Sequence, residues 1–387
     1  MRMMLKPVAI AAAVAGLALA MGPALAQETI KIGVNQPLTG AVAASGTYVA
    51  QGAQIAAEEI NANGGIDGKK IELIIEDNKS NPKEAVAAAE KLIVRDKVPV
   101  MMGAWSSTYT LAVMPKLMEY EVPMVVETSS SGKITTQGNP WVFRISPTSE
   151  MEALAFKDKV DAFKITKANF LSVNNDWGLG AAEQFAKALK DKGIEVGVVE
   201  TMNADATDMS AQLSAIKAAG GDTLFVTTGV EQLTLILKQA ADLRLEQQII
   251  TTGGSSSPDQ LIAQAGPAAN GSHHIVFFAP WFPEAAANPE VATKFVKAWE
   301  EKGYNFAGLT EGFRGYDGIY VIAEAIKQAG SLEPDAIRQA LWNVQFEGIN
   351  GDIKFIKQGP EGKESAQNVP NIYVVKIEDG KVTLPDT

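Results

Sequence analysis

The stretch IELIIEDNKSNPKEAVAAAEKLIVRDKVPVMM, residues 71–102, decides the fold. Residues 71–76 form an apolar, β-branched run that predicts a strand. A helical pattern covers residues 82–96, and Pro82 suits the first turn of a helix, where its missing N–H is not needed. Residues 98–102 predict a second strand. A strand, a helix and a strand in so short a span indicate parallel strands joined by a covering helix.

The same alternation continues outward from this stretch. It repeats about 125–140 residues later, in architecture and not in identical residues. The further strands expected are 31–34, 123–126, 169–173, 195–200, 223–227, 248–251, 353–356 and 372–377; the further helices are 48–61, 107–121, 180–192, 208–219, 231–243, 289–301, 316–329 and 334–342. The sequence therefore predicts an α/β protein with two similar doubly wound lobes. Ligands of open α/β sheets bind beyond the carboxyl ends of the strands, so we expect a cleft between the lobes.

Composition excludes several classes of protein. The chain has 387 residues, 46% of them hydrophobic, which is enough for two domains with buried cores. Its net charge of −11 has the wrong sign for a non-specific nucleic-acid binder. It contains no cysteine, which excludes thiol catalysis, disulfides and cysteine-ligated zinc.

The first 26 residues have the pattern of a secretory signal peptide. Arg2 and Lys6 precede an apolar run at residues 8–20, and the segment ends in the small-residue sequence Ala24-Leu25-Ala26. The run is short for a membrane span. We expect cleavage after Ala26 and export of a soluble, acidic chain to a bacterial periplasm.

Two hydroxyl-rich loops are candidates for binding a carboxylate. The first, around Trp105 and Ser107, follows one predicted strand, and the second, Thr128-Ser129-Ser130, follows the next. Hydroxyl groups and free backbone N–H groups at a helix start can hold a carboxylate without a cationic side chain. Helix capping is the alternative interpretation. Two such loops after adjacent strands make binding as plausible as capping.

Other motifs give weaker signals. Trp177, before a predicted helix of the second lobe, could close a pocket by stacking on a ligand, or could pack within its own lobe. Ser130-x-x-Lys133 resembles a penicillin-binding nucleophile pattern, but its companion motifs are absent. His273 and His274 are neighbours in a predicted strand and so point to opposite faces, which argues against a shared metal ion. We expect no metal and no cofactor.

Several motifs together resemble the periplasmic leucine/isoleucine/valine-binding protein family, the solute receptors of ABC importers. The resemblance is carried by KIGV at 31–34, PLTG at 37–40, INANGGIDG at 60–68, Asp77, NP at 81–82 and Arg144. It covers the mature chain and is strongest in the first lobe. It implies a type I binding-protein fold whose lobes close on a ligand like a flytrap. Three crossovers are expected, near Pro147, Ala279 and Ile349. Lobe 1 would then hold 27–147 plus 280–348, and lobe 2 148–279 plus 349–387.

The resemblance also implies site residues. The family's carboxylate-holding positions fall on Ser107, Thr128 and Ser130, with Trp105 and Ser129 beside them. These are the two loops that the sequence pattern already indicates. The family's ligand-lining aromatic positions fall on Ser45, Trp177 and Gly229.

Departures from the family pattern bear on the ligand. Family members that bind amino acids hold the ammonium with acidic residues, and those positions fall on Ser149 and Gly253. A buried ammonium without a carboxylate partner would be costly. With small residues at 45 and 229, an aromatic or other apolar acid without an α-ammonium is the leading hypothesis. If the alignment slips by one residue, Glu150 restores the acid and a branched-chain or other neutral amino acid becomes the ligand.

The sequence therefore predicts a monomeric transport receptor without enzymatic activity. It would bind a small carboxylate and present it to an inner-membrane ABC permease. A periplasmic sensor would use the same clamp and stays open as an alternative. A hydrolase is the third hypothesis, but it would need a nucleophile paired with a base or a metal, and no pattern here provides either.

Overall fold

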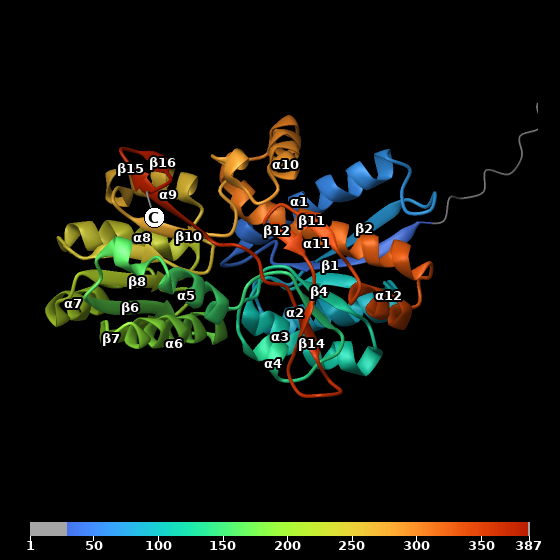
Figure 1. Ribbon diagram of the computed structural model, residues 1–387, viewed down its shortest axis with the longest axis horizontal. Coiled ribbons are helices and arrows are strands. Elements are labelled where there is room, and N and C mark those ends of the chain that lie inside the picture. Colours follow the sequence, from blue (N-terminus) through green and yellow to red (C-terminus); the bar gives the residue numbers. More distant parts are fainter. Residues whose placement is uncertain (1–28, 386–387) are drawn as a thin grey trace, which may run out of the picture.

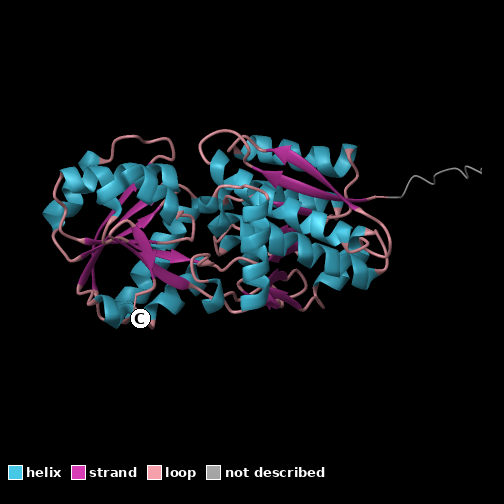
Figure 2. Cartoon of the chain, turned by 90° about the horizontal axis from the view of Figure 1, so that it is seen from above, coloured by secondary structure: helices cyan, strands magenta, loops and turns pink. Residues whose placement is uncertain are grey.

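The structure, a computed structural model, describes residues 29–385, and the predicted signal peptide lies outside them. The chain folds into two α/β lobes that lie side by side, as Figure 1 shows. Helices cover both faces of each sheet (Figure 2). This confirms the predicted fold class. Among the described residues, none of the helices is long and apolar enough to cross a membrane.

The first lobe is built on a seven-stranded sheet with the order β13-β14-β5-β4-β3-β1-β2. The strands from β14 to β2 pair in parallel, and only β13 is antiparallel to its neighbour. Their bounds are β1 Ile30–Gln36, β2 Ile71–Asp77, β3 Met101–Gly103, β4 Met124–Val126, β5 Val142–Arg144, β13 Ile356–Gln358 and β14 Ser365–Gln367.

The helices of the first lobe come from both ends of the chain. They are α1 Ala43–Ala62, α2 Pro82–Glu90, η1 Lys91–Arg95, α3 Ser107–Tyr120, α4 Lys133–Thr136, α10 Pro289–Glu301, η5 Phe306–Gly308, α11 Leu309–Ala329 and α12 Pro334–Leu341. The predicted helix 82–96 begins at Pro82, where Asn81 accepts a hydrogen bond from the Lys83 N–H, and it continues through the π-helical turn η1. Gly52 lets α1 approach α11 closely, because a Cβ there would lie 1.8 Å from the Gly312 carbonyl oxygen.

The second lobe repeats the plan with a sheet of order β16-β15-β10-β9-β8-β6-β7. Its strands are β6 Lys167–Val173, β7 Glu195–Met202, β8 Thr223–Thr227, β9 Gln248–Thr251, β10 His273–Val276, β15 Tyr373–Glu378 and β16 Lys381–Thr383. Its helices are α5 Ser149–Lys157, η2 Val160–Phe163, α6 Asp176–Asp191, α7 Ser210–Ala219, α8 Val230–Asp242, α9 Pro258–Ala265 and η3 Gly266–Ala269.

Three segments cross between the lobes. They are residues 145–148 between β5 and α5, residues 277–288 between β10 and α10 with the short turn η4 Pro283–Ala285, and residues 368–372 between β14 and β15. The first of these segments contains Pro147 and the second contains Ala279. The third does not lie at Ile349. Ile349 lies in the turn of a separate hairpin, β11 Phe346–Gly348 with β12 Gly351–Ile353.

The predicted lobe boundary at residue 349 is therefore displaced. β14 pairs in parallel with β5, and β13 pairs with β14, so residues 356–367 belong to the first sheet and not to the second lobe. The physical reason is that contacts between residues far apart in the sequence determine which strands pair in a sheet. Three-residue strands carry too little local pattern to reveal those contacts. The chain then enters the second lobe as β15, antiparallel to β10.

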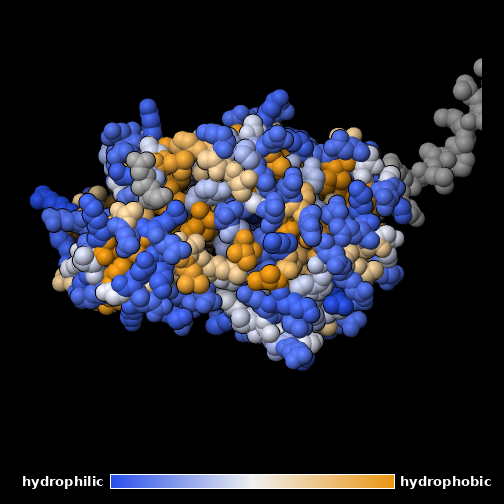
Figure 3. Space-filling model, in the orientation of Figure 1, coloured by the Kyte–Doolittle hydropathy of each residue, from blue (hydrophilic) through white to orange (hydrophobic). Residues whose placement is uncertain are grey.

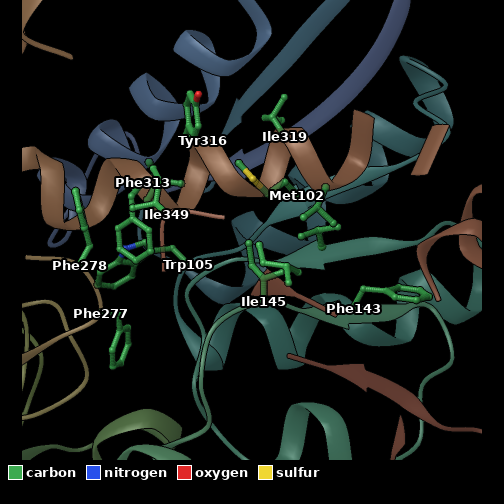
Figure 4. Packing of buried hydrophobic residues seen from close by; sticks show 14 of the residues in the cluster. Met102, Trp105, Phe143, Ile145, Phe277, Phe278, Phe313, Tyr316, Ile319 and Ile349 are labelled. Atoms are coloured by element: carbon green, nitrogen blue, oxygen red, sulfur yellow. The ribbon is translucent and has the colours of Figure 1, made fainter. Parts of the chain in front are cut away.

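Buried aromatic side chains fill the space where the first lobe meets the crossovers. Figure 4 shows Trp105 beside Phe278, Phe313 and Ile349, so the loop after β3 packs against α11 and the second crossover. On the face seen in Figure 3, hydrophilic side chains cover most of both lobes, and hydrophobic residues form scattered small groups.

Candidate ligand site between the lobes

The carboxyl ends of β3 and β4 lie next to each other, because the two strands are parallel neighbours. The loops that follow them meet residues of the second lobe and line a cavity of about 250 Å³, a volume that includes space open to solvent. The cavity lies between the two lobes, and its lining is rich in hydroxyl groups: Trp105, Ser106, Ser107, Thr128, Ser129, Ser130, Trp177, Gly253 and Ser255.

Helix α3 starts at this cavity with Ser107. The side chain of Ser106, at its N-cap, makes no capping hydrogen bond. The Oγ of Ser107 accepts a hydrogen bond from the Ser131 N–H at 3.1 Å, so its own O–H is free to donate to a ligand. A helix start with available donors attracts an anion.

The hydroxyl groups of the second loop fall into two kinds. Ser129 is used within the protein: its Oγ donates to the Trp105 carbonyl at 2.8 Å and lies 2.8 Å from the Thr110 hydroxyl. Ser129 therefore ties the two loops together. Thr128 and Ser130 make only longer contacts, to Glu127 at 3.4 Å and to the Ser149 hydroxyl at 3.3 Å. Their hydroxyl groups are the better donors for a ligand.

A buried arginine supports the second loop from behind. Arg144 donates to the carbonyl groups of Ser129 at 3.2 Å and Ser131 at 2.7 Å, and to the side chain of Gln367 at 2.6 Å. Burial lowers the pKa of Arg144 to about 9. This cation fixes the loop and adds positive potential behind the hydroxyl groups.

Trp177 forms the wall contributed by the second lobe. It lies in the first turn of α6, whose N-cap Asn175 accepts a hydrogen bond from the Gly178 N–H. A Cβ added to Gly253 would lie 2.4 Å from Cζ2 of Trp177, so the indole rests directly on Gly253. Because residue 253 has no side chain, the Trp177 indole can occupy this position.

Seven of the ten predicted site residues line this cavity: Trp105, Ser107, Thr128, Ser129, Ser130, Trp177 and Gly253. Ser149 lies behind Ser130. Ser45 and Gly229 do not line it. A Cβ at Gly229 would lie 3.9 Å from Val42 of the first lobe and 3.4 Å from the Glu231 carboxylate, so this glycine faces a different part of the contact between the lobes.

The predicted substitute acid, Glu150, is exposed and lies outside the cavity. The buried acid of the same helix is Glu152, whose Oε1 accepts a hydrogen bond from the Gly253 N–H at 2.6 Å. Sequence reasoning missed Glu152, Ser255, Glu311 and Arg314. Charged residues within the apolar pattern of α11 could have indicated the last two.

The lobes touch on both sides of the cavity. On one side, Asp176 of the second lobe accepts hydrogen bonds from Thr108 at 3.2 Å and from Lys133 at 2.9 Å. On the other, Arg314 of α11 donates to the Gly254 carbonyl at 2.9 Å.

The two histidines pack against residues of their own lobe. His274 lies between the hydroxyl groups of Thr251 and Ser272, and burial lowers its pKa to about 3. His273 packs edge-on against Phe163. Within residues 29–385 there is no cluster of acidic or histidine side chains suited to a metal ion.

This fold, two seven-stranded lobes with a site between them, is that of type I periplasmic binding proteins. The chain belongs to the periplasmic binding protein family, whose pattern matches residues 29–381. A leucine-, isoleucine-, valine-, threonine- and alanine-binding protein of Pseudomonas aeruginosa is 29% identical over 350 residues, 90% of this chain and 91% of that protein.

Two solved structures extend the comparison. The substrate-binding protein of a branched-chain amino acid transporter from Streptococcus pneumoniae, in complex with isoleucine, is 27% identical with a TM-score of 0.79. It covers 92% of this chain, and 100% of its own length is matched. A solute-binding protein of an ABC transporter from Rhodopseudomonas palustris, in complex with 3,4-dihydroxybenzoic acid, is also 27% identical, with a TM-score of 0.78. The match covers 92% of this chain and 95% of that one.

Proposed function

We propose that this chain is the periplasmic receptor of an ABC importer and that it captures a small carboxylate by closing its lobes. The observation that carries the proposal is the cavity between the lobes. It offers hydroxyl groups from Ser107, Thr128 and Ser130 on one wall and the Trp177 indole on the other. Such a site can bind a carboxylate and cover it, and it contains no nucleophile paired with a base.

The leading ligand is an aromatic or other apolar acid without an α-ammonium group. Ser149 offers no charge at the first of the family's ammonium-binding positions. At the second of these positions, an acidic side chain in place of Gly253 would clash with the Trp177 ring. Glu150 is exposed and does not replace them. The relative that binds 3,4-dihydroxybenzoic acid supports this class of ligand.

The alternative ligand is a neutral amino acid. Two observations favour it: the relative that binds isoleucine, and Glu152, a fully buried carboxylate whose Oε2 has no hydrogen-bond partner among residues 29–385. Glu152 already accepts the Gly253 N–H, so it could offer an ammonium group only its second oxygen.

A thermal-shift screen of the chain from Gln27 onward separates these ligands. Benzoate, 4-hydroxybenzoate and 3,4-dihydroxybenzoate are expected to raise the melting temperature, and L-leucine and L-isoleucine are not. A ligand present at 100 times its Kd stabilises the folded state by about 2.7 kcal/mol. A shift with the amino acids alone would replace the proposed ligand class by the alternative. Recovery of a chemically altered ligand after incubation would point to an enzyme instead.

A further inference from the structure

A group of buried charged side chains lies on the hinge side of the ligand cavity. Glu311 and Arg314 lie one turn apart on α11 of the first lobe, 0% and 1% exposed, with 3.2 Å between Arg314 Nε and Glu311 Oε2. Glu127 follows β4 in the same lobe and is 1% exposed. Glu152 is 0% exposed and comes from α5 of the second lobe. We call Glu127, Glu152, Glu311 and Arg314 the hinge charge cluster.

The cluster lies where the crossovers bend. A second cavity, of about 330 Å³, is lined by Glu127 and Arg314 together with residues of all three crossovers, at 145–147, Phe277 and 368–370. The Arg314 guanidinium lies 5.1 Å from the Phe277 ring and donates to the Gly254 carbonyl of the second lobe. Movement of the lobes about these crossovers must change the surroundings of the cluster.

The cluster holds more acid than base. Arg314 is the cation that acts on the carboxyl groups of Glu127, Glu152 and Glu311. Its charge is already matched by Glu311 on the same helix, and that pair stays together when the lobes separate. Glu152 belongs to the second lobe, so its distance from Arg314 depends on how the lobes are arranged, and it adds a carboxyl group to a pair whose Nε and Oε2 lie 3.2 Å apart without a hydrogen bond. A second buried negative charge without a cation of its own is costly.

Two features of Glu152 favour its ionised form. It lies in the first turn of α5 and accepts the Gly253 N–H. A helix start changes a pKa by less than about one unit, whereas full burial changes it by up to about 3–5 units in the opposite direction. Burial therefore prevails and raises the pKa of Glu152 to about 8, despite the Gly253 N–H and Arg314.

We propose that closure of the lobes buries Glu152 beside the pair of Arg314 and Glu311, and that the chain takes up one proton at Glu152 when it closes on its ligand. The inference rests on the proposed function, closure of the lobes on an acid without an ammonium group, because an ammonium held by Glu152 would keep that carboxylate ionised. The buried acids Glu127 and Asp317 are less suited to this role because they lie in the first lobe together with Arg314 and Glu311, so closure does not bring them to that pair. Glu127 accepts a hydrogen bond from Gln36 within the first lobe, and Asp317 is held by the Ile349 N–H, also within that lobe.

The direction of the pH effect follows from the raised pKa. The closed state holds a proton that the open state releases at neutral pH, so low pH favours binding. Between about pH 6 and pH 7, one linked proton increases the Kd about tenfold. Above the closed-state pKa of about 8, both states are ionised and the dependence ends.

The test is calorimetric titration at about pH 7 in buffers of different protonation enthalpy. Benzoate and 3,4-dihydroxybenzoate are the probes. The wild-type chain is expected to take up about one proton per probe bound. Glu152→Gln keeps an oxygen for the Gly253 N–H and is expected to bind without proton uptake. Glu150→Gln, on the exposed side of the same helix, is the matched control and should behave like wild type.

Glu231 needs its own control, since it is a second acid that closure could bury. It lies at the start of α8 and faces Tyr48 and Glu311 of the first lobe, and burial raises its pKa. Glu231→Gln should therefore keep the uptake that Glu152→Gln loses. No proton uptake by the wild type, or equal uptake in Glu152→Gln, would overturn the inference.

A measurement without ligand separates this inference from the ligand assignment. The chain has no cysteine, so spin labels can be placed at Lys83→Cys in the first lobe and Lys187→Cys in the second. If none of the probes binds, the proposed ligand class is wrong. The distance between the two spin labels then tests whether closure of the lobes depends on pH. A closed population that grows from about pH 8 to about pH 6 in wild type, but not in Glu152→Gln, supports the inference. Equal populations at every pH overturn it.

Discussion

Replacing Ser107 by alanine together with Thr128 by valine is expected to weaken ligand binding by more than about a hundredfold. Each substitution removes one hydroxyl donor while nearly keeping side-chain volume. A hydrogen bond to a charged group is worth about 1.5–3 kcal/mol, and about 1.4 kcal/mol corresponds to a tenfold change in Kd. The measurement is calorimetric titration with the acid that gives the largest thermal shift.

The control for this double variant is a pair of the same substitutions away from the cleft. Thr207→Val and Ser210→Ala lie just before and at the start of α7, and they should leave the Kd unchanged. Both double variants should keep the wild-type circular dichroism spectrum. If the Ser107 and Thr128 double variant bound the acid as tightly as wild type, the two loops would not be the carboxylate site.

Gly253→Ala is expected to weaken binding by about ten- to a hundredfold, which corresponds to losing the burial of one aromatic side chain against the ligand. The new Cβ would lie 2.4 Å from Cζ2 and 2.8 Å from Nε1 of Trp177, so the indole must leave its position. The change is measured as the Kd and as the tryptophan fluorescence response to added acid, which should shrink with the affinity.

Gly193→Ala separates this clash from backbone strain. Gly193 has a φ of +80°, close to the +84° of Gly253, but a Cβ there would have no neighbour within 4 Å. Both variants should lose about 1–2 kcal/mol of stability from the left-handed backbone. Only Gly253→Ala should lose affinity. Equal affinity in the two variants would show that Trp177 does not cover the ligand.

Local patterns allowed most of the fold to be predicted. The helix expected at residues 289–301 forms as α10 with those bounds, because Pro289 starts it and an apolar stripe gives it one buried face. The third crossover could not be predicted in the same way. Its position depends on the pairing of β14 with β5, more than 200 residues away. The local pattern of a three-residue strand does not predict that pairing.

The candidate site also has a part that the sequence predicts and a part that it does not. The two hydroxyl loops could be brought together from the sequence, because parallel neighbouring strands end at one edge of a sheet. Ser45 and Gly229 were placed by family positions alone, and Gly229 faces Val42 of the other lobe. The hinge charge cluster was missed because its members come from α5, α11 and the residue after β4, which lie far apart in the sequence.

The most direct measurement is a crystal structure of the chain from Gln27 onward, grown with the acid that gives the largest thermal shift. We expect one ligand between the lobes, with its carboxylate within about 3.2 Å of Ser107 and Thr128 and its apolar part against Trp177. A ligand bound on the outer face of either lobe, or a carboxylate in the cleft turned away from both hydroxyl loops, would contradict the account.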